Sequence, residues 1–101
     1  MAYKIIASKL FQQRVIALNS YLQKEWGFSV ASRFHEALIK VILTLADQPG
    51  IGSVSKNKKD VRKILITKDN RLYYRVKDKE TIFLLTLFDT RQNPKRNKYE
   101  Q

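Results

Sequence analysis

The chain contains no cysteine and only one histidine, His35. Disulfides and thiolate zinc sites are therefore excluded, and a single imidazole cannot build a histidine metal site. No run approaches the ~20 apolar residues that a membrane span requires. The N-terminal MAYKIIASKL also lacks the apolar core of a signal sequence. We therefore expect a cytoplasmic protein that needs no metal and no other cofactor.

Acidic side chains are scarce as well. The chain has 20 Lys and Arg against 9 Asp and Glu, which gives a net charge of +11. Residues 1–50 carry 6 basic and 3 acidic side chains, whereas residues 51–101 carry 14 and 6, so most of the excess lies in the second half. Such a charge favours nucleic acids, an acidic protein or an anionic membrane surface as partner. A length of 101 residues predicts a single domain, residues 1–101.

The first half has the pattern of a short strand followed by two helices. Residues 3–7 favour extended structure, and Ser8 can cap the helix that follows. The first helix is indicated by apolar residues at helical spacing, namely Phe11, Val15, Leu18, Leu22 and Trp26. Gly27 should end it, with Trp26 closing the end of the hairpin as part of the core. A second helix should begin near Ser29 and end before Pro49, forming an antiparallel hairpin with the first.

The second half predicts a loop and a three-strand meander. Residues 48–60 hold two of the three glycines and a lysine cluster, so they should form a loop. The last apolar run, TIFLLTLF, is apolar on both faces and belongs in the middle of a sheet. The expected strands are residues 61–67, 71–77 and 81–88. The fold class is α+β, with an N-terminal strand, a two-helix hairpin and a three-strand antiparallel meander. We expect the N-terminal strand to join the meander in one antiparallel sheet and the hairpin to cover one face of that sheet.

Three segments give this sequence a resemblance to the RelE/ParE superfamily of bacterial toxins. They are Arg62 at the start of the first meander strand, RLYYRV at 71–76 and LFDTRQNP at 87–94. The resemblance covers nearly the whole chain and implies the toxin of a type II toxin–antitoxin, or plasmid stabilisation, module that inhibits growth. It also implies an antitoxin that wraps and neutralises the toxin. The RelE branch cuts messenger RNA on the ribosome, whereas the ParE branch poisons DNA gyrase without catalysis by the toxin.

The chemistry of RNA cleavage favours the ParE branch. Cleavage through the 2′-hydroxyl needs a proton acceptor, cations for the charged phosphorane and a proton donor for the leaving oxygen. Ribonucleases resembling RelE carry two alternating lysines in the first meander strand, where this chain has Arg62 and Ile64. Another ribonuclease style uses a C-terminal histidine, which this chain lacks. Arg71 and Arg91 match the family's arginines and Tyr99 is a displaced tail tyrosine, so no obvious base remains.

Gyrase is therefore the expected target, and the ribosome with messenger RNA is the alternative. A plain basic RNA- or DNA-binding module is a third interpretation. In a ribonuclease the catalytic residues would be Arg62, Arg71 and Arg91. The residues expected to bind target or phosphate are Lys56, Lys58, Lys59, Arg62, Arg71, Arg75 and Arg91.

Two further expectations concern the aromatic residues and the partner. Tyr73 and Tyr74 alternate faces, so one should pack on the helices while the exposed one could stack on a base. The partner should be an acidic antitoxin encoded by a neighbouring gene, and we expect no membrane partner. Its poorly folded segment should lie on the helical hairpin or add a strand to the sheet edge, with its carboxylates at Arg62, Arg71 and Arg91.

Overall fold

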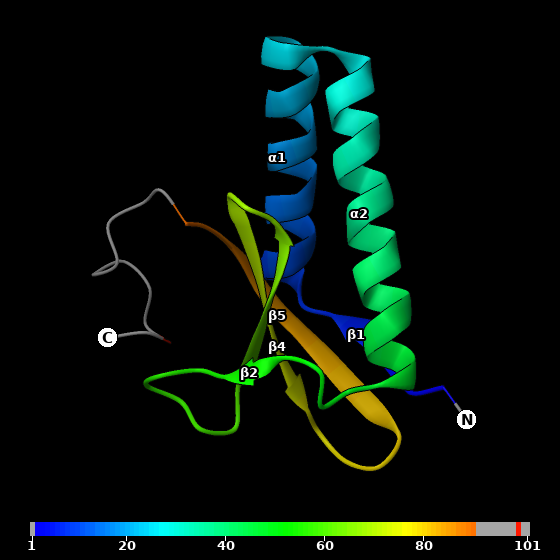
Figure 1. Ribbon diagram of the computed structural model, residues 1–101, viewed down its shortest axis with the longest axis vertical. Helices are drawn as coiled ribbons and strands as arrows, with labels where there is room; N and C mark the ends of the chain where they lie inside the picture. The colour runs from blue at the N-terminus through cyan, green and yellow to red at the C-terminus, as the bar shows by residue number, and fades with distance from the viewer. Residues whose placement is uncertain (1, 91–98, 100–101) are drawn as a thin grey trace.

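A computed structural model describes residues 2–90 and residue 99 (Figure 1). Its elements are β1 (Lys4–Ala7), α1 (Lys9–Trp26), α2 (Phe28–Asp47), β2 (Ser53–Val54), β3 (Arg62–Thr67), β4 (Asn70–Val76) and β5 (Thr81–Asp89). The strands form one sheet in the order β1-β5-β4-β3-β2, and the two helices lie against one of its faces. This arrangement confirms the predicted α+β fold. In the described part of the chain, no helix is long and apolar enough to cross a membrane.

The helical hairpin begins and turns at the residues that the sequence indicates. The Ser8 hydroxyl accepts a hydrogen bond from the Phe11 N–H at 2.9 Å, which caps the start of α1. Gly27 has φ 94°, a conformation that favours glycine, and it both ends α1 and begins α2. The placement of Trp26 in the core is wrong, because its side chain is 66% exposed. The hairpin extends past the end of the sheet, so nothing in the sheet can cover its tip (Figure 1).

The sheet is mixed rather than purely antiparallel. β5 lies between β1 and β4, which confirms the central position predicted from its apolar sequence. β3, β4 and β5 are antiparallel neighbours, but β1 pairs with β5 in parallel, from Lys4 opposite Thr81 to Ala7 opposite Leu84. The predicted loop at 48–60 also contains a strand, since Ser53 and Val54 pair with the start of β3. A two-residue strand leaves too short a pattern to be recognised in the sequence.

Beyond the end of β1, polar side chains form hydrogen bonds with the edge of β5 that none of the described strands pairs with. The Ser8 hydroxyl donates to the Leu85 carbonyl at 2.7 Å. Further along, from the second turn of α1, Arg14 Nη1 donates to the Leu87 carbonyl at 2.9 Å and to the Thr86 hydroxyl at 2.7 Å. Buried backbone carbonyls need such partners. These bonds fix α1 against the sheet along the part of β5 that β1 does not reach.

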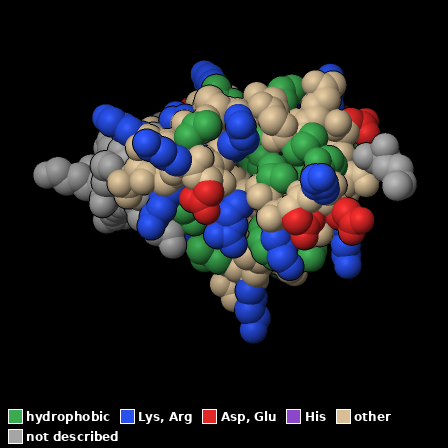
Figure 2. Space-filling model, turned by 90° about the horizontal axis from the view of Figure 1, so that it is seen from below, with side chains coloured by type: hydrophobic (Ala, Val, Ile, Leu, Met, Phe, Trp, Pro, Cys, Tyr) green, Lys and Arg blue, Asp and Glu red, His purple; other side chains and the backbone are tan. Residues whose placement is uncertain are grey.

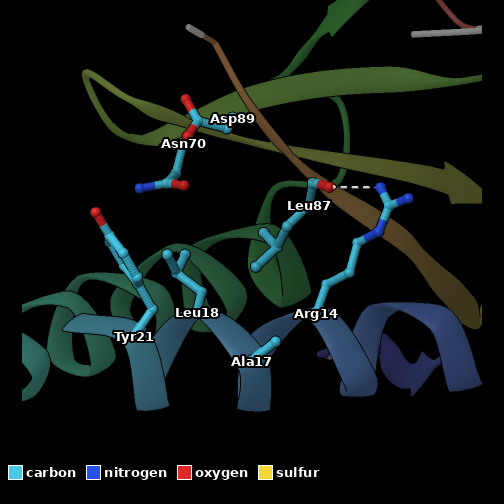
Figure 3. Close-up of a pocket in the computed structure, with 7 residues that line it drawn as sticks. All are labelled: Arg14, Ala17, Leu18, Tyr21, Asn70, Leu87 and Asp89. Atoms are coloured by element: carbon cyan, nitrogen blue, oxygen red, sulfur yellow. Dashed lines mark hydrogen bonds between the residues drawn. The ribbon is translucent and has the colours of Figure 1, made fainter. Parts of the chain in front are cut away.

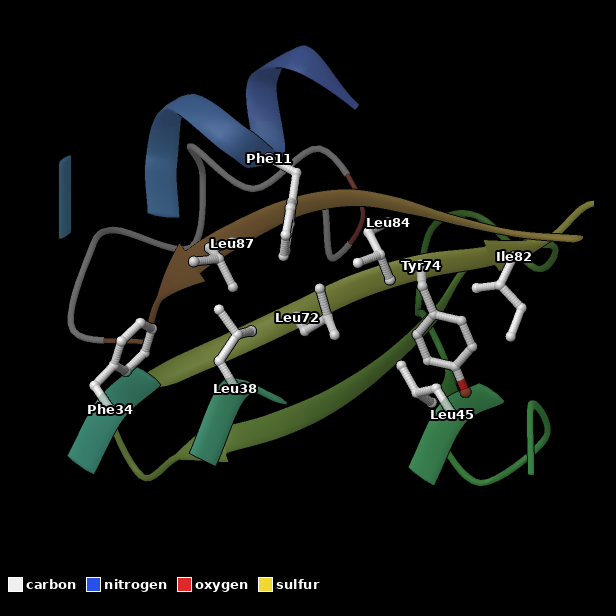
Figure 4. Close-up of a cluster of buried hydrophobic side chains, with 9 residues drawn as sticks. All are labelled: Phe11, Phe34, Leu38, Leu45, Leu72, Tyr74, Ile82, Leu84 and Leu87. Carbon is white, nitrogen blue, oxygen red and sulfur yellow. The ribbon is translucent and has the colours of Figure 1, made fainter. Parts of the chain in front are cut away.

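The core lies between the hairpin and the helix-facing side of β4 and β5 (Figure 4). Its buried members are Phe11, Phe34, Leu38, Leu45, Leu72, Tyr74, Ile82, Leu84 and Leu87. The register of β4 and β5 shifts between Tyr73 and Tyr74, so that Tyr73 faces Thr86 while Tyr74 faces Leu84. Leu85 is thus the extra residue of a β-bulge. Because of this bulge, the next core residue of β5 after Leu84 is Leu87, three positions further on instead of two.

The hydroxyl of Tyr74 joins this core to the loop that follows α2. It donates to the Pro49 carbonyl at 2.7 Å and accepts from the Gly52 N–H at 2.9 Å. The loop passes so close to the ring that a Cβ on Gly52 would lie 2.6 Å from the Tyr74 hydroxyl oxygen and 2.7 Å from the Lys63 carbonyl oxygen. Residue 52 must therefore be glycine, because there is no room for a side chain at this position.

We predict that Gly52→Ala destabilises the protein by about 1–3 kcal/mol, the usual cost of forcing an extra methyl group into a packed site. Gly50→Ala is the matched control, because a Cβ at Gly50 meets nothing within 4 Å. Urea unfolding of the wild type and both variants measures the effect. Equal stability of the two variants would contradict the close approach of this loop to Tyr74.

Candidate target-binding site on the helix-free face

Strand alternation divides the predicted site residues between the two faces of the sheet. Side chains of directly paired residues lie on the same face, and neighbours along a strand lie on opposite faces. Arg62 pairs with Tyr74, whose ring belongs to the core beneath the helices. Lys63 pairs with Tyr73, and Arg71 and Arg75 alternate with core residues of β4. We call the side with Lys63, Arg71, Tyr73 and Arg75 the helix-free face.

Arg62 consequently lies on the opposite face from Arg71. Its Nη1 donates to the Gly52 carbonyl at 2.6 Å and to the Gly50 carbonyl at 3.4 Å. The guanidinium therefore holds the same loop that Tyr74 holds. Sequence reasoning grouped Arg62 with Arg71 and Arg91 in one cationic set, and the structure places the first two on opposite faces. Arg91 lies outside the described residues.

Burial raises the pKa of the Tyr74 hydroxyl above its ordinary value of 10.0. The hydrogen bond from Gly52 and the positive charge of Arg62 both lower this pKa, but burial has the larger effect. Tyr74 is thus a neutral structural group at physiological pH, and Arg62 is a positioning residue for the loop that leads to β2.

The first of two clusters on the helix-free face consists of Arg71 and the aromatic rings of Tyr73 and Tyr99. Arg71 Nη1 donates to the Tyr73 hydroxyl at 3.1 Å. The ring of Tyr99 stacks on the ring of Tyr73 with centroids 5.0 Å apart and planes 22° from parallel. The expectation that either Tyr73 or Tyr74 is exposed is wrong, because both are fully buried, one against the core and the other beneath Tyr99.

The second cluster centres on Phe83 of β5. The Arg75 guanidinium lies 5.8 Å and the Lys77 ammonium 5.3 Å from the ring centroid, within the range of cation–π attraction. Arg75 also pairs with Asp60 at 3.6 Å. Lys63 and Lys77 were not predicted from the sequence. Lys77 follows Arg75 by two residues, a spacing that could have placed it on this face, whereas Lys63 is placed here only by its pairing with Tyr73.

The three loop lysines lie on the connection between β2 and β3. Lys56, Lys58 and Lys59 are all exposed. The turn that carries them is closed by Ser55, whose hydroxyl donates to the Lys58 carbonyl at 2.6 Å. Their backbone is therefore ordered by local bonds while their charged ends face solvent.

A separate cleft lies on the helix-covered side, between α1 and the adjoining ends of β4 and β5 (Figure 3). Its volume is about 430 Å³. Ala17, Leu18 and Tyr21 project into it from α1, and Leu87 projects toward them from β5. Its polar lining residues are Arg14, Asn70 and Asp89. In the part of the chain that the structure describes, no carboxylate pairs with Arg14, which uses Nη1 for its bonds to β5.

The sequence matches the family described as the ParE toxin of the type II toxin–antitoxin system, parDE, over residues 5–94. The chain therefore belongs to the ParE toxin family, within the RelE/ParE superfamily, and membership implies an antitoxin partner. Comparison with curated protein sequences gives no significant match.

Solved structures from several organisms resemble this chain, including one from P. aeruginosa and two from Helicobacter pylori. A chain of the chromosomal ParDE system of P. aeruginosa has TM-score 0.73 at 13% identity, covering 87% of this chain and 96% of that one. A copper-bound mutant toxin of Helicobacter pylori has TM-score 0.63 at 26% identity, with coverages of 89% and 96%. The conserved hypothetical protein HP0894 of the same organism is 31% identical, with TM-score 0.54 and coverages of 89% and 96%.

The raised pKa of Tyr74 predicts a loss of stability at high pH. As pH rises above 10.0, the Tyr74 hydroxyl loses its proton in the unfolded chain before it does so in the folded protein. Protonated Tyr74 thus contributes stability that is complete below pH 10 and is lost as pH rises through the folded pKa.

We expect the free energy of unfolding of the wild type to fall above pH 10 more steeply than that of Tyr74→Phe. Urea titrations of both proteins between about pH 9 and pH 11 measure this difference. Parallel pH dependences would show that the Tyr74 hydroxyl is not buried as described.

Proposed function

We propose that this toxin inhibits DNA gyrase by binding, without cleaving nucleic acid. The observation that carries the proposal is the separation of Arg62 from Arg71 by the sheet. A ribonuclease needs several cations around one scissile phosphate, together with groups that accept and donate protons. Here Arg62 is bonded to a loop on the far side, so these two arginines do not converge.

The helix-free face also offers little for acid–base chemistry. His35 lies on α2, on the other side of the sheet. Ile64, at the position where RelE-like ribonucleases carry their second lysine, pairs with the core residue Leu72 and so lies on the helix-covered face. Among the described residues, the carboxylate in contact with this face is Asp60, which is ion-paired with Arg75. These features support a site that binds an anionic target.

A ribosome-dependent endoribonuclease is the second candidate, and one observation favours it. Tyr99 stacks on Tyr73 next to Arg71. A tail tyrosine near an arginine is a feature of the RelE-like ribonucleases that the sequence resembles. The two candidates share their fold, so the choice between them depends on function assays.

The antitoxin should occupy the cleft between α1 and the strand ends. The apolar floor of Ala17, Leu18 and Leu87 suits an apolar anchor side chain, while Arg14 can receive a carboxylate from the same segment. The net charge of +11 favours an acidic partner. We therefore propose that the antitoxin's acidic segment lies against the helical hairpin, one of the two sites expected from the sequence, with Arg14 as its cation.

We predict that the purified toxin inhibits supercoiling of relaxed plasmid by gyrase and does not cut messenger RNA on ribosomes. Arg71→Ala should weaken the inhibition by about tenfold or more, because a charge-assisted contact contributes about 1.5–3 kcal/mol. Arg33→Ala on α2 removes the same charge from an exposed position and should leave inhibition unchanged. Codon-phased cleavage of messenger RNA that is lost in Arg71→Ala would instead establish the ribonuclease.

We also predict that Ala17→Glu weakens binding of the cognate antitoxin by about tenfold or more, because like charges brought together in an interface are strongly unfavourable. Ile16→Glu adds the same charge one residue earlier, outside the lining of the cleft, at a side chain that is 67% exposed. Isothermal titration calorimetry compares the two variants. Equal loss of affinity would place the antitoxin away from the cleft.

A further inference from the structure

The basic loop of residues 55–60 is attached to the helix-free face by contacts at two positions. The Asn57 N–H donates to the Tyr99 carbonyl at 2.7 Å, and the Tyr99 ring in turn stacks on Tyr73 of β4. Asp60 pairs with Arg75, also of β4, at 3.6 Å. The loop and the face are therefore neighbouring parts of one surface, although their residues come from different elements.

We call this combined area the cationic surface. Its positively charged members are Lys56, Lys58, Lys59, Lys63, Arg71, Arg75 and Lys77. Figure 2 views the molecule from the end that carries the loop and the β4–β5 turn, and Lys and Arg side chains are spread widely over it with fewer acidic ones. Among the residues that the structure describes, the nearby carboxylates are Asp60, which is paired, and the turn residues Asp78 and Glu80. The surface suits a ligand with many negative charges.

Two aromatic rings of this surface, those of Tyr73 and Phe83, are already occupied by protein groups. Tyr73 is fully buried and stacks on Tyr99. Phe83 has Arg75 and Lys77 over its ring. Proteins that bind single strands use exposed rings on which bases stack. With the rings of Tyr73 and Phe83 so engaged, we assign recognition to the cations, whose contacts with phosphates carry no sequence information.

We propose that the cationic surface binds the phosphate backbone of duplex DNA, independently of sequence. Six residues separate Arg71 from Lys77, about 20 Å at ~3.3 Å per residue. Duplex DNA presents about 12 phosphates along that length. The biological setting rests on the proposed function, since the DNA would be the segment held by gyrase. Arg62 has no part in this contact, because its guanidinium is bonded to the loop carbonyls on the other face.

Two triple variants of equal net charge test the proposal. Lys56→Ala, Lys63→Ala and Lys77→Ala together remove three cations from the cationic surface. The control combines Lys24→Ala, Arg33→Ala and Lys40→Ala, which removes three exposed cations from the helices. Binding of each folded protein to a fluorescent 20-base-pair duplex is measured by anisotropy across a range of salt concentrations. A single strand of the same length is measured in parallel, with thermal unfolding as a check on folding.

We expect the surface variant to bind duplex roughly 100-fold more weakly than wild type at about 0.15 M salt, because each lost phosphate contact reduces the slope of log K against log salt by about 0.9. The helix variant should lose less than about threefold. Equal losses in both variants, tighter binding of the single strand, or no binding of duplex by the wild type would each overturn the proposal.

The outcomes also separate this inference from the proposed function. Duplex binding that depends on the cationic surface, without inhibition of gyrase, would leave the DNA site standing and refute the gyrase assignment. Inhibition of gyrase that the surface variant retains in full would support the gyrase assignment and overturn the DNA site.

Discussion

Packing of the helical hairpin against one side of β4 and β5 determines where every other side chain of the sheet points. Leu72, Tyr74, Ile82 and Leu84 are buried together beneath the helices. Because alternate residues of a strand lie on opposite faces, burial of this set turns Arg71, Tyr73 and Arg75 to the other side. The hydrophobic core thus creates the cationic surface indirectly, by leaving Lys63, Arg71 and Arg75 on the face that no helix covers.

Arg62 departs from this division, and its contacts explain how it can. It lies on the helix-covered face, where an unpaired charge would be costly. The carbonyls of Gly50 and Gly52 accept hydrogen bonds from its guanidinium, and the Tyr74 hydroxyl satisfies Pro49 and the Gly52 N–H beside it. Arg62, Tyr74 and Gly52 therefore act as one unit that sets the loop before β2. That unit also decides where the lysines of residues 56–59 emerge.

The molecule consequently has two separate surfaces of different chemistry. The cleft beside α1 combines an apolar floor with Arg14, whereas the cationic surface on the other side of the sheet is dominated by charge. An antitoxin segment in the cleft and a polyanion on the cationic surface would not compete for the same atoms. Neutralisation by a cleft-bound antitoxin would then require part of it to extend around the sheet edge, or would act by blocking the target enzyme sterically.

Much of the architecture follows from local patterns in the sequence. Ser8 and Gly27 mark the ends of α1 because capping and a positive φ are properties of single residues. The sequence of β5 is apolar on both faces, which indicates a central strand because neighbours on both sides are needed to bury it. The net charge and the scarcity of histidine also limit the chemistry of the site, since both are fixed by composition alone.

Other features arise only when distant segments meet. Strand direction leaves no trace in a four-residue pattern, so the parallel pairing of β1 was not predictable, and neither was β2. The bulge at Leu85 and the stacking of Tyr99 on Tyr73 bury a tyrosine that alternation alone would expose. Above all, Arg62 and Arg71 look equivalent in the sequence, because each is an arginine in a strand of the meander. The register between β3 and β4 assigns them to opposite faces, and register is set by the packing of the whole core against the helices.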